Sequence, residues 1–167
     1  MSILLNTSNN CILQQSSYDA LQYIYNDLNG RHWHYRNTSQ QWSFPSPLSA
    51  PCEIPWQGIS CNVTMMSGCD VIGLNLGHMN LSGTISSQIS GLSQLHHLNL
   101  EANHITGSFP ESMSNIQSLT SILASLNPIT GTLPSSWSTL QHFQELFVSK
   151  SHLQGLLPES WSAMSAM

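Results

Sequence analysis

The sequence predicts an α/β solenoid in which short coils stack side by side and each coil adds one strand to a parallel sheet. Two observations predict this fold: a repeat of 24 residues fills the second half of the chain, and apolar residues alternate within each repeat. A third observation, one helical pattern and 4 cysteines ahead of the repeats, predicts a small helical cap containing disulfides at the N-terminal end.

The repeats begin at Val71, Leu95, Leu119 and Phe143, and these segments align without a gap. In each of them, positions 1, 4, 6, 11, 15, 19 and 22 are apolar and position 13 is glycine. Because side chains alternate along a strand, positions 4 and 6 face the core while positions 3, 5 and 7 face outward. A single coil cannot bury its apolar face alone, so the coils must stack.

Special residues mark the turns of each repeat. Glycine at position 13 suits a tight turn in which a Cβ atom would clash. Asn103 and Asn127 at position 9 carry amides that can satisfy buried backbone groups. Proline follows position 15 in the last three repeats, where it removes an N–H group and discourages another strand on the far side.

The segment ahead of the repeats contains one helical pattern, at residues 17–29, with Ser17 as its N-cap and Gly30 as its stop. Its apolar stripe consists of Leu21, Ile24, Tyr25 and Leu28. We therefore expect a tail at 1–15, a cap at 16–70 and four repeats at 71–167. Met167 opens a fifth repeat, so we expect a truncated or uncapped end that permits end-to-end self-association.

Composition excludes several classes of function. Charged residues are 7% of the chain, against about 25% in typical domains. The 3 Lys and Arg residues are scattered and cannot neutralise a run of phosphates, which excludes a nucleic-acid partner. We expect no membrane span, since no apolar stretch approaches about 20 residues, and no leader peptide is visible at the start.

The 4 cysteines are Cys11, Cys52, Cys61 and Cys69. Their even number and clustering favour two disulfides and an oxidising compartment, although reduced thiols in an intracellular protein are the alternative. Acceptor triplets for N-glycosylation occur at Asn6, Asn37, Asn62 and Asn80. Together these features favour an extracellular or cell-surface glycoprotein.

Catalytic and metal sites are not predicted. The densest cluster of candidate ligands contains His97 and Glu101, which would lie about 13 Å apart on a strand rising about 3.3 Å per residue. Zinc requires ligand atoms at about 2 Å, so these two side chains cannot share one ion. We expect solvated surface histidines, no cofactor and no enzyme activity. The tryptophans at position 19, Trp137 and Trp161, are interpreted as core residues.

The repeat, of the form L-x-x-L-x-L-x-x-N-x-L-x-G-x-I-P-x-x-L-x-x-L, resembles the plant-type leucine-rich repeat, with Leu95–Ser118 as its closest copy. The segment Cys52 to Cys61 resembles the C-x-W-x-G-[VI]-x-C motif of the N-terminal cap in secreted proteins of this type. The resemblance implies a right-handed leucine-rich-repeat solenoid. It also implies a Cys52–Cys61 pair, which leaves Cys11 and Cys69, while related caps imply Cys11–Cys52 with Cys61–Cys69.

The same resemblance extends to receptor-like kinase ectodomains and polygalacturonase-inhibiting-type proteins. It implies a non-catalytic extracellular recognition module whose concave face binds a protein or peptide. A fragment of a receptor ectodomain would be one such module. The outward positions and turns supply the candidate contacts Asn75, His97, Asn99, Glu101, Leu123, Leu126, Glu145 and Phe147. Carbohydrate is a second ligand class, and an adhesive glycosylated surface protein or an intracellular scaffold are the alternative functions. The low charge favours hydrogen bonding and apolar contact over electrostatic steering.

Overall fold

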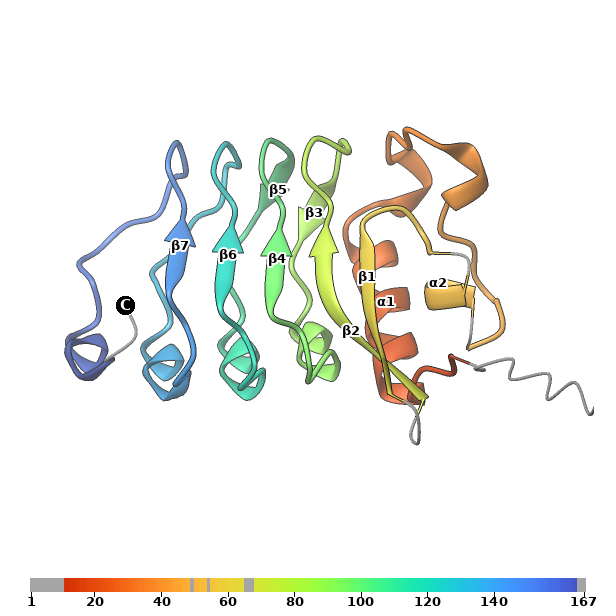
Figure 1. Ribbon diagram of the computed structural model, residues 1–167. Helices are drawn as coiled ribbons and strands as arrows, with labels where there is room; N and C mark the ends of the chain where they lie inside the picture. Colours follow the sequence, from red (N-terminus) through yellow and green to blue (C-terminus); the bar gives the residue numbers. More distant parts are fainter. Residues whose placement is uncertain (1–10, 49, 54, 65–67, 165–167) are drawn as a thin grey trace, which may run out of the picture.

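The computed structural model describes residues 11–48, 50–53, 55–64 and 68–164 and has the expected architecture, a right-handed α/β solenoid with a cap at one end (Figure 1). Its main sheet has five strands in the order β1-β2-β4-β6-β7. These strands are β1 (Ile59–Thr64), β2 (Gly68–Asn75), β4 (His97–Asn99), β6 (Ser121–Leu123) and β7 (Glu145–Phe147). The four repeat strands are parallel, as expected.

Strand β1 is an addition that the repeat pattern does not contain. It pairs antiparallel with β2, so the cap contributes the first strand of the sheet. The pairing is irregular, since Ser60 pairs with Gly73 but Cys61 pairs with Val71, which leaves Ile72 as an extra residue in β2. Such a β-bulge bends its strand and redirects a side chain.

The coils bury the positions that the alternation assigns to the core. Leu74, Leu98 and Ile122 at position 4 are at most 2% exposed. Opposite the sheet, each coil contains a short 3-10 helix: η3 (Ser87–Gly91), η4 (Glu111–Asn115), η5 (Ser135–Thr139) and η6 (Glu159–Ala163). Two coils also pair on the turn side through β3 (Ser82–Thr84) and β5 (His104–Thr106). The proline after position 15 is expected to discourage a strand on this side of the coil. The short second sheet corrects that expectation, and it can form because its strands end before the position of the proline.

Buried asparagines join neighbouring coils. Asn103 Oδ1 accepts hydrogen bonds from the N–H groups of Met79 and Leu81 at 3.1 and 3.0 Å. Its Nδ2 donates to the carbonyl of Leu76 at 2.9 Å, and Asn127 contacts the carbonyl of Leu100 in the same way. These amides therefore satisfy backbone groups that lie inside the turn, away from water.

The cap helix α1 (Gln15–Asp27) begins two residues before the expected N-cap. Ser17 is therefore not a cap. It is buried, and its hydroxyl donates to the carbonyl of Gly91 at 3.3 Å. The left-handed residue after the helix is Asn29, with φ 59°, rather than Gly30. Gly30 is required for space instead, because a Cβ atom there would lie 2.1 Å from the Tyr25 ring.

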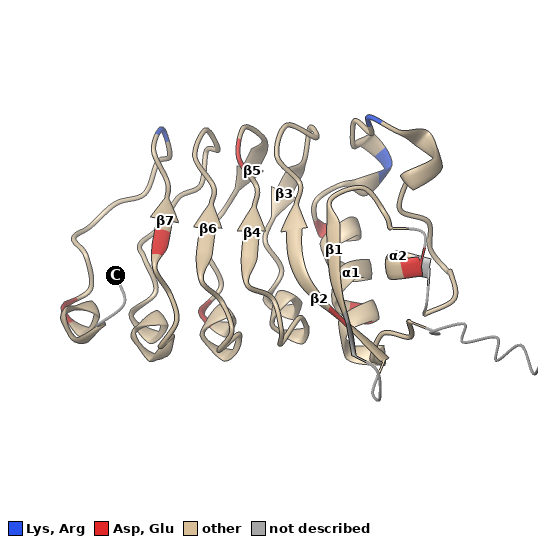
Figure 2. Cartoon of the chain, in the orientation of Figure 1, with Lys and Arg blue, Asp and Glu red and all other residues tan. Residues whose placement is uncertain are grey.

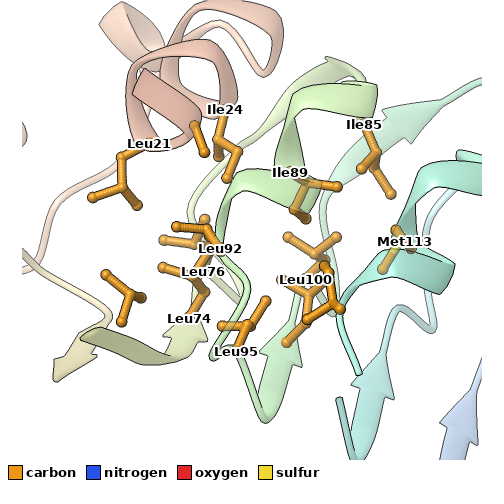
Figure 3. Packing of buried hydrophobic residues seen from close by; sticks show 14 of the residues in the cluster. Leu21, Ile24, Leu74, Leu76, Ile85, Ile89, Leu92, Leu95, Leu100 and Met113 are labelled. Atoms are coloured by element: carbon orange, nitrogen blue, oxygen red, sulfur yellow. The ribbon is translucent and has the colours of Figure 1, made fainter. Parts of the chain in front are cut away.

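Helix α1 acts as the first layer of the solenoid. Figure 3 shows Leu21 and Ile24 of this helix directed towards Leu76 and Leu92 of the first coil. The remainder of the cap contains η1 (Gly30–His32), η2 (Thr38–Gln40) and α2 (Ala50–Glu53). Its core is a cluster of aromatic rings, with Trp42 centred 4.9 Å from Trp33 and 5.6 Å from Trp56. All three tryptophans are buried, as core residues should be.

Two disulfides close the cap, Cys11–Cys69 and Cys52–Cys61. This is the pairing implied by the motif between Cys52 and Cys61, and it excludes the Cys11–Cys52 alternative. The residues just before α1 are also held in place, since Leu13 is 2% exposed and forms a bridge to Cys69. Residues 11–14, expected in the tail, therefore pack as part of the cap.

Candidate functional site

The repeat strands arrange the outward side chains in rows that cross the coils. Gly73, His97, Ser121 and Glu145 are successive partners in one row, and Asn75, Asn99, Leu123 and Phe147 are partners in the next. Adjacent strands lie about 4.8 Å apart, so neighbours in a row are close enough for one ligand to contact both. Glu101 and Leu126 lie in the turns after β4 and β6. All eight predicted contacts thus belong to one surface.

One half of this surface is apolar. Phe147 is 53% exposed and pairs in register with Leu123, which is half-buried. Leu126 is 42% exposed, and its N–H group donates to the carbonyl of Ser149 at 2.9 Å in the neighbouring turn. We call Leu123, Leu126 and Phe147 the apolar cluster. Position 5 points away from the core, so another coil beside β7 would flank Phe147 without covering it.

The backbone of the turn explains why Leu126 is outside the core. Position 8 adopts a left-handed conformation in each repeat, with φ between 53° and 61° at His78, Ala102, Leu126 and Lys150. This conformation places no demand for an apolar side chain, and it costs most residues about 1–2 kcal/mol relative to the right-handed region. Packing therefore gives no reason for a leucine at position 126.

The other half of the surface is polar and well ordered by hydrogen bonds. His97 Nδ1 lies 2.9 Å from Ser121 Oγ and 3.2 Å from Thr120 Oγ1. Asn99 Oδ1 accepts the N–H group of Glu101 at 2.9 Å, which fixes the amide plane. Asn75 is exposed beside Asn99. His97 and Asn99 are therefore held by one polar atom of each side chain, His97 Nδ1 and Asn99 Oδ1.

The third coil interrupts the rows. Ser121 and Ser125, at outward positions 3 and 7, are each only 6% exposed. Neighbouring groups cover both serines: Ser121 contacts the larger His97 at 2.9 Å, while Ser125 Oγ contacts both the backbone N–H and the hydroxyl of Ser149 at 3.1 Å. The alternation of the strand predicts that these two side chains point outward. It does not predict how far neighbouring groups cover a small side chain.

Charge on this surface is sparse and acidic. Figure 2 shows a single acidic position on β7, which is Glu145, and few charged residues along the rest of the sheet. At positions 3, 5 and 7 the charged residues are Glu101 and Glu145. The nearest cation along the same coil is Lys150, in the turn after β7. The face is thus suited to neutral ligands or to ligands carrying an isolated positive charge.

A hollow of about 360 Å³ lies at the cap end of the same face, between β1, β2 and β4. It is lined by Ser60, Ile72, Gly73, Asn75, His97 and Asn99, among others. Sequence reasoning missed Ser60 and Ile72 because it did not identify β1. The signal was present, since Ile59, Cys61 and Val63 alternate with polar residues as in a half-buried strand. A larger hollow of about 650 Å³ in the cap is walled mainly by polar groups and lies apart from the repeat strands.

The candidate glycosylation sites differ in access. Asn37 is exposed, and its Oδ1 accepts from Ser39 at 3.0 Å, which leaves Nδ2 facing away from that contact. Asn62 is exposed on β1. Asn80 is half-buried and its Nδ2 donates to the carbonyl of His32 at 3.1 Å, so a glycan there would have to displace a cap contact. Asn6 lies outside the described residues.

Other chemistry is limited in the described part of the chain. No three His, Cys, Asp or Glu side chains converge there as metal ligands would. Burial raises the pKa of the Tyr35 hydroxyl above its ordinary value, so this cap residue stays protonated. None of the helices among the described residues is long and apolar enough to cross a bilayer.

Comparison with known proteins agrees with this architecture. The family model described as Leucine Rich Repeat matches residues 94–116. A stretch of 64 residues is 45% identical to the receptor protein-tyrosine kinase CEPR2 of Arabidopsis thaliana. This stretch covers 38% of this chain but only 6% of that protein. The chain therefore spans a small part of this receptor kinase.

Solved structures extend the similarity to the cap. A chain in the BIR3–SERK2 complex from Arabidopsis thaliana superposes with a TM-score of 0.74 and 28% identity, covering 89% of this chain and 76% of that one. The plant peptide hormone receptor RGFR1, in complex with RGF2, has a TM-score of 0.55 and 32% identity, covering 56% of this chain and 15% of that one. Together with the 24-residue repeat and the disulfide-bonded cap, these similarities show that the chain has the leucine-rich-repeat solenoid fold of plant receptor kinase ectodomains.

Proposed function

We propose that this chain is a non-catalytic extracellular recognition module that binds a peptide, or a peptide segment of a protein, on its concave face. The observation that carries the proposal is the apolar cluster, because Phe147 and Leu126 expose 53% and 42% of their surface at positions where the fold does not need apolar residues. Exposed apolar residues that gather on one face of a rigid scaffold are typical of binding sites.

Two further observations support this function. Asn75, His97 and Asn99 offer donors and acceptors in register beside the cluster, as a peptide backbone would require. RGFR1 is itself described as a peptide hormone receptor, and the two disulfides of the cap fit an extracellular location.

The test uses phage-displayed random short peptides selected on the intact chain. We expect enriched peptides whose binding is weakened about tenfold or more by Leu123→Asp with Phe147→Ala, since two apolar contacts are lost. Leu126→Asn is a gentler variant, because asparagine tolerates the left-handed conformation of this turn and the fold is retained.

Ala102→Asn is the matched control, since it places the same side chain at the same turn position of another coil. It should leave binding unchanged. If no peptide is enriched, or if enriched peptides bind all these variants equally well, the concave face is not the binding site and the proposal is wrong.

The extracellular location has its own test. Protein isolated from its natural source under alkylating conditions should show no reactive thiol after denaturation, because the four cysteines are paired. Four alkylated cysteines would favour the intracellular scaffold instead.

A further inference from the structure

The hollow between β1, β2 and β4 has a specific structural origin. Position 3 carries His97, Ser121 and Glu145 in the other coils but Gly73 in the first coil, so the row begins with a gap. Beside it β1 contributes only Ser60, the register partner of Gly73. The β-bulge then turns the extra residue, Ile72, so that it lines the hollow together with Leu74.

Gly73 is not explained by the fold. A Cβ atom at this position would lie 3.3 Å from Ser60 Cβ, a tight contact that a small shift of an exposed side chain relieves. The backbone there is not in the left-handed region, in contrast to Gly83, where a Cβ atom would lie 2.0 Å from the Asp27 carbonyl oxygen. Glycine at position 73 therefore opens space on the binding face rather than relieving backbone strain.

The chemistry of the hollow indicates its occupant. Its lining is largely apolar, and it also includes the polar side chains of Asn75, His97 and Asn99. A volume of about 360 Å³ falls within the usual range of about 300–1,000 Å³ for binding pockets with an apolar lining and few polar groups. An apolar side chain would fit the apolar lining, while the flanking amide groups of a peptide would meet the polar side chains.

The acidic residues on the same face add a second requirement. Gly73 and Glu145 belong to one row and are separated by three strand spacings of about 4.8 Å, or about 14 Å in total. An extended peptide rises about 3.3 Å per residue and covers that distance in about four residues. A Lys or Arg side chain about four residues from the apolar one would therefore lie opposite Glu145.

We propose that this hollow receives a large apolar side chain of an extended peptide that crosses β2, β4, β6 and β7, and that a basic residue about four positions away pairs with Glu145. The inference rests on the proposed function and narrows its ligand class. Peptides selected on the intact chain should share an apolar residue and a basic residue at this spacing, in either chain direction.

The main experiment fills the hollow. Ser60→Leu places an apolar side chain into it from an exposed position, so the variant should fold, as circular dichroism can verify. We expect it to weaken the selected peptides about tenfold or more by competing with the apolar side chain. Ser108→Leu is the control: Ser108 is exposed on the turn side of the coil, and the equivalent position of the fourth repeat already carries Leu156.

The second experiment tests the charge pair with a double-mutant cycle. Glu145→Gln should weaken a selected peptide about threefold when its Lys is present, as expected for an exposed ion pair, and leave the Lys-to-Gln version of the peptide unchanged. Equal effects on both peptides would exclude the pairing.

The outcomes separate this inference from the proposed function. Peptides that depend on Phe147 but bind Ser60→Leu as well as the original chain would overturn the inference and leave the proposed function standing. Peptides that are insensitive to both sets of variants, or the absence of any enriched peptide, would overturn both.

Discussion

The second repeat, 95–118, and the described part of the fourth, 143–164, have the same sequence pattern but different burial. Leu98 at position 4 is fully buried, whereas its equivalent Leu146 is half-buried. The contrast is greater at position 15, where Phe109 is 3% exposed and Leu157 is 69% exposed. The burial of a repeat residue is therefore decided by the coils on both sides of it, and not by its own coil alone.

Hydrogen bonding differs between these repeats in the same way. Asn103 of the second repeat is 4% exposed and connects its own turn to the first coil through backbone groups. The fourth repeat has the half-buried Ser151 at this position, which is too short to span the same groups. The interior repeats are thus joined by a polar network as well as by packing.

The largest expected effect is the loss of this network. Asn103→Ala should lower the free energy of unfolding by about 4 kcal/mol, because two buried N–H groups lose their acceptor at about 1–3 kcal/mol each. Urea unfolding followed by tryptophan fluorescence would measure it. Ser151→Ala, the same truncation in the fourth repeat, should cost less than about 0.5 kcal/mol. Equal costs would contradict the difference between the repeats.

Packing should give the next largest difference. Leu98→Ala removes a fully buried side chain and should cost about 3 kcal/mol, within the range of about 2–5 measured for such cavities. Leu146→Ala should cost about 1 kcal/mol, since less apolar surface returns to water and the edge can relax. The same urea series measures both variants, and a larger cost for Leu146→Ala would show that the fourth coil is covered in solution.

The repeat itself could be predicted from sequence because it is local and periodic. The alternation at positions 4 and 6 identified the strands and their inward residues, and Asn103 and Asn127 have the backbone contacts that their amides predict. The cap was less predictable. Helix α1 begins at Gln15 rather than after Ser17, because burial of Ser17 against Gly91 outweighs its preference for the N-cap position.

The candidate site also has a part that the repeat pattern predicts and a part that depends on the cap. The rows of outward residues follow from the period, but the hollow at Gly73 depends on β1, which belongs to the cap and pairs with β2 over a long range. A bulge such as that at Ile72 has no periodic signal. Exposure within a row also escaped prediction, as Ser121 shows, because it depends on the size of the neighbouring side chains.

The smallest expected effect concerns two tryptophans. In this pair we expect the larger cost at the less buried residue, in contrast to the two preceding predictions. Trp137 is fully buried and stacks on Trp161, with ring centroids 6.0 Å apart. Trp161 Nε1 donates to the carbonyl of Pro134 at 3.0 Å, whereas Trp137 Nε1 is buried without a hydrogen-bond partner among the described residues. The more interior tryptophan is therefore the one with the unsatisfied polar group.

Trp137→Phe should change the free energy of unfolding by less than about 1 kcal/mol, because removing an unpaired buried N–H offsets part of the lost packing. Trp161→Phe should cost about 1–2 kcal/mol more, since the Pro134 carbonyl loses its donor. Thermal unfolding by circular dichroism would rank the two variants. If Trp137→Phe is the more damaging, packing alone governs both positions, and the coils differ only in how completely their neighbours cover them.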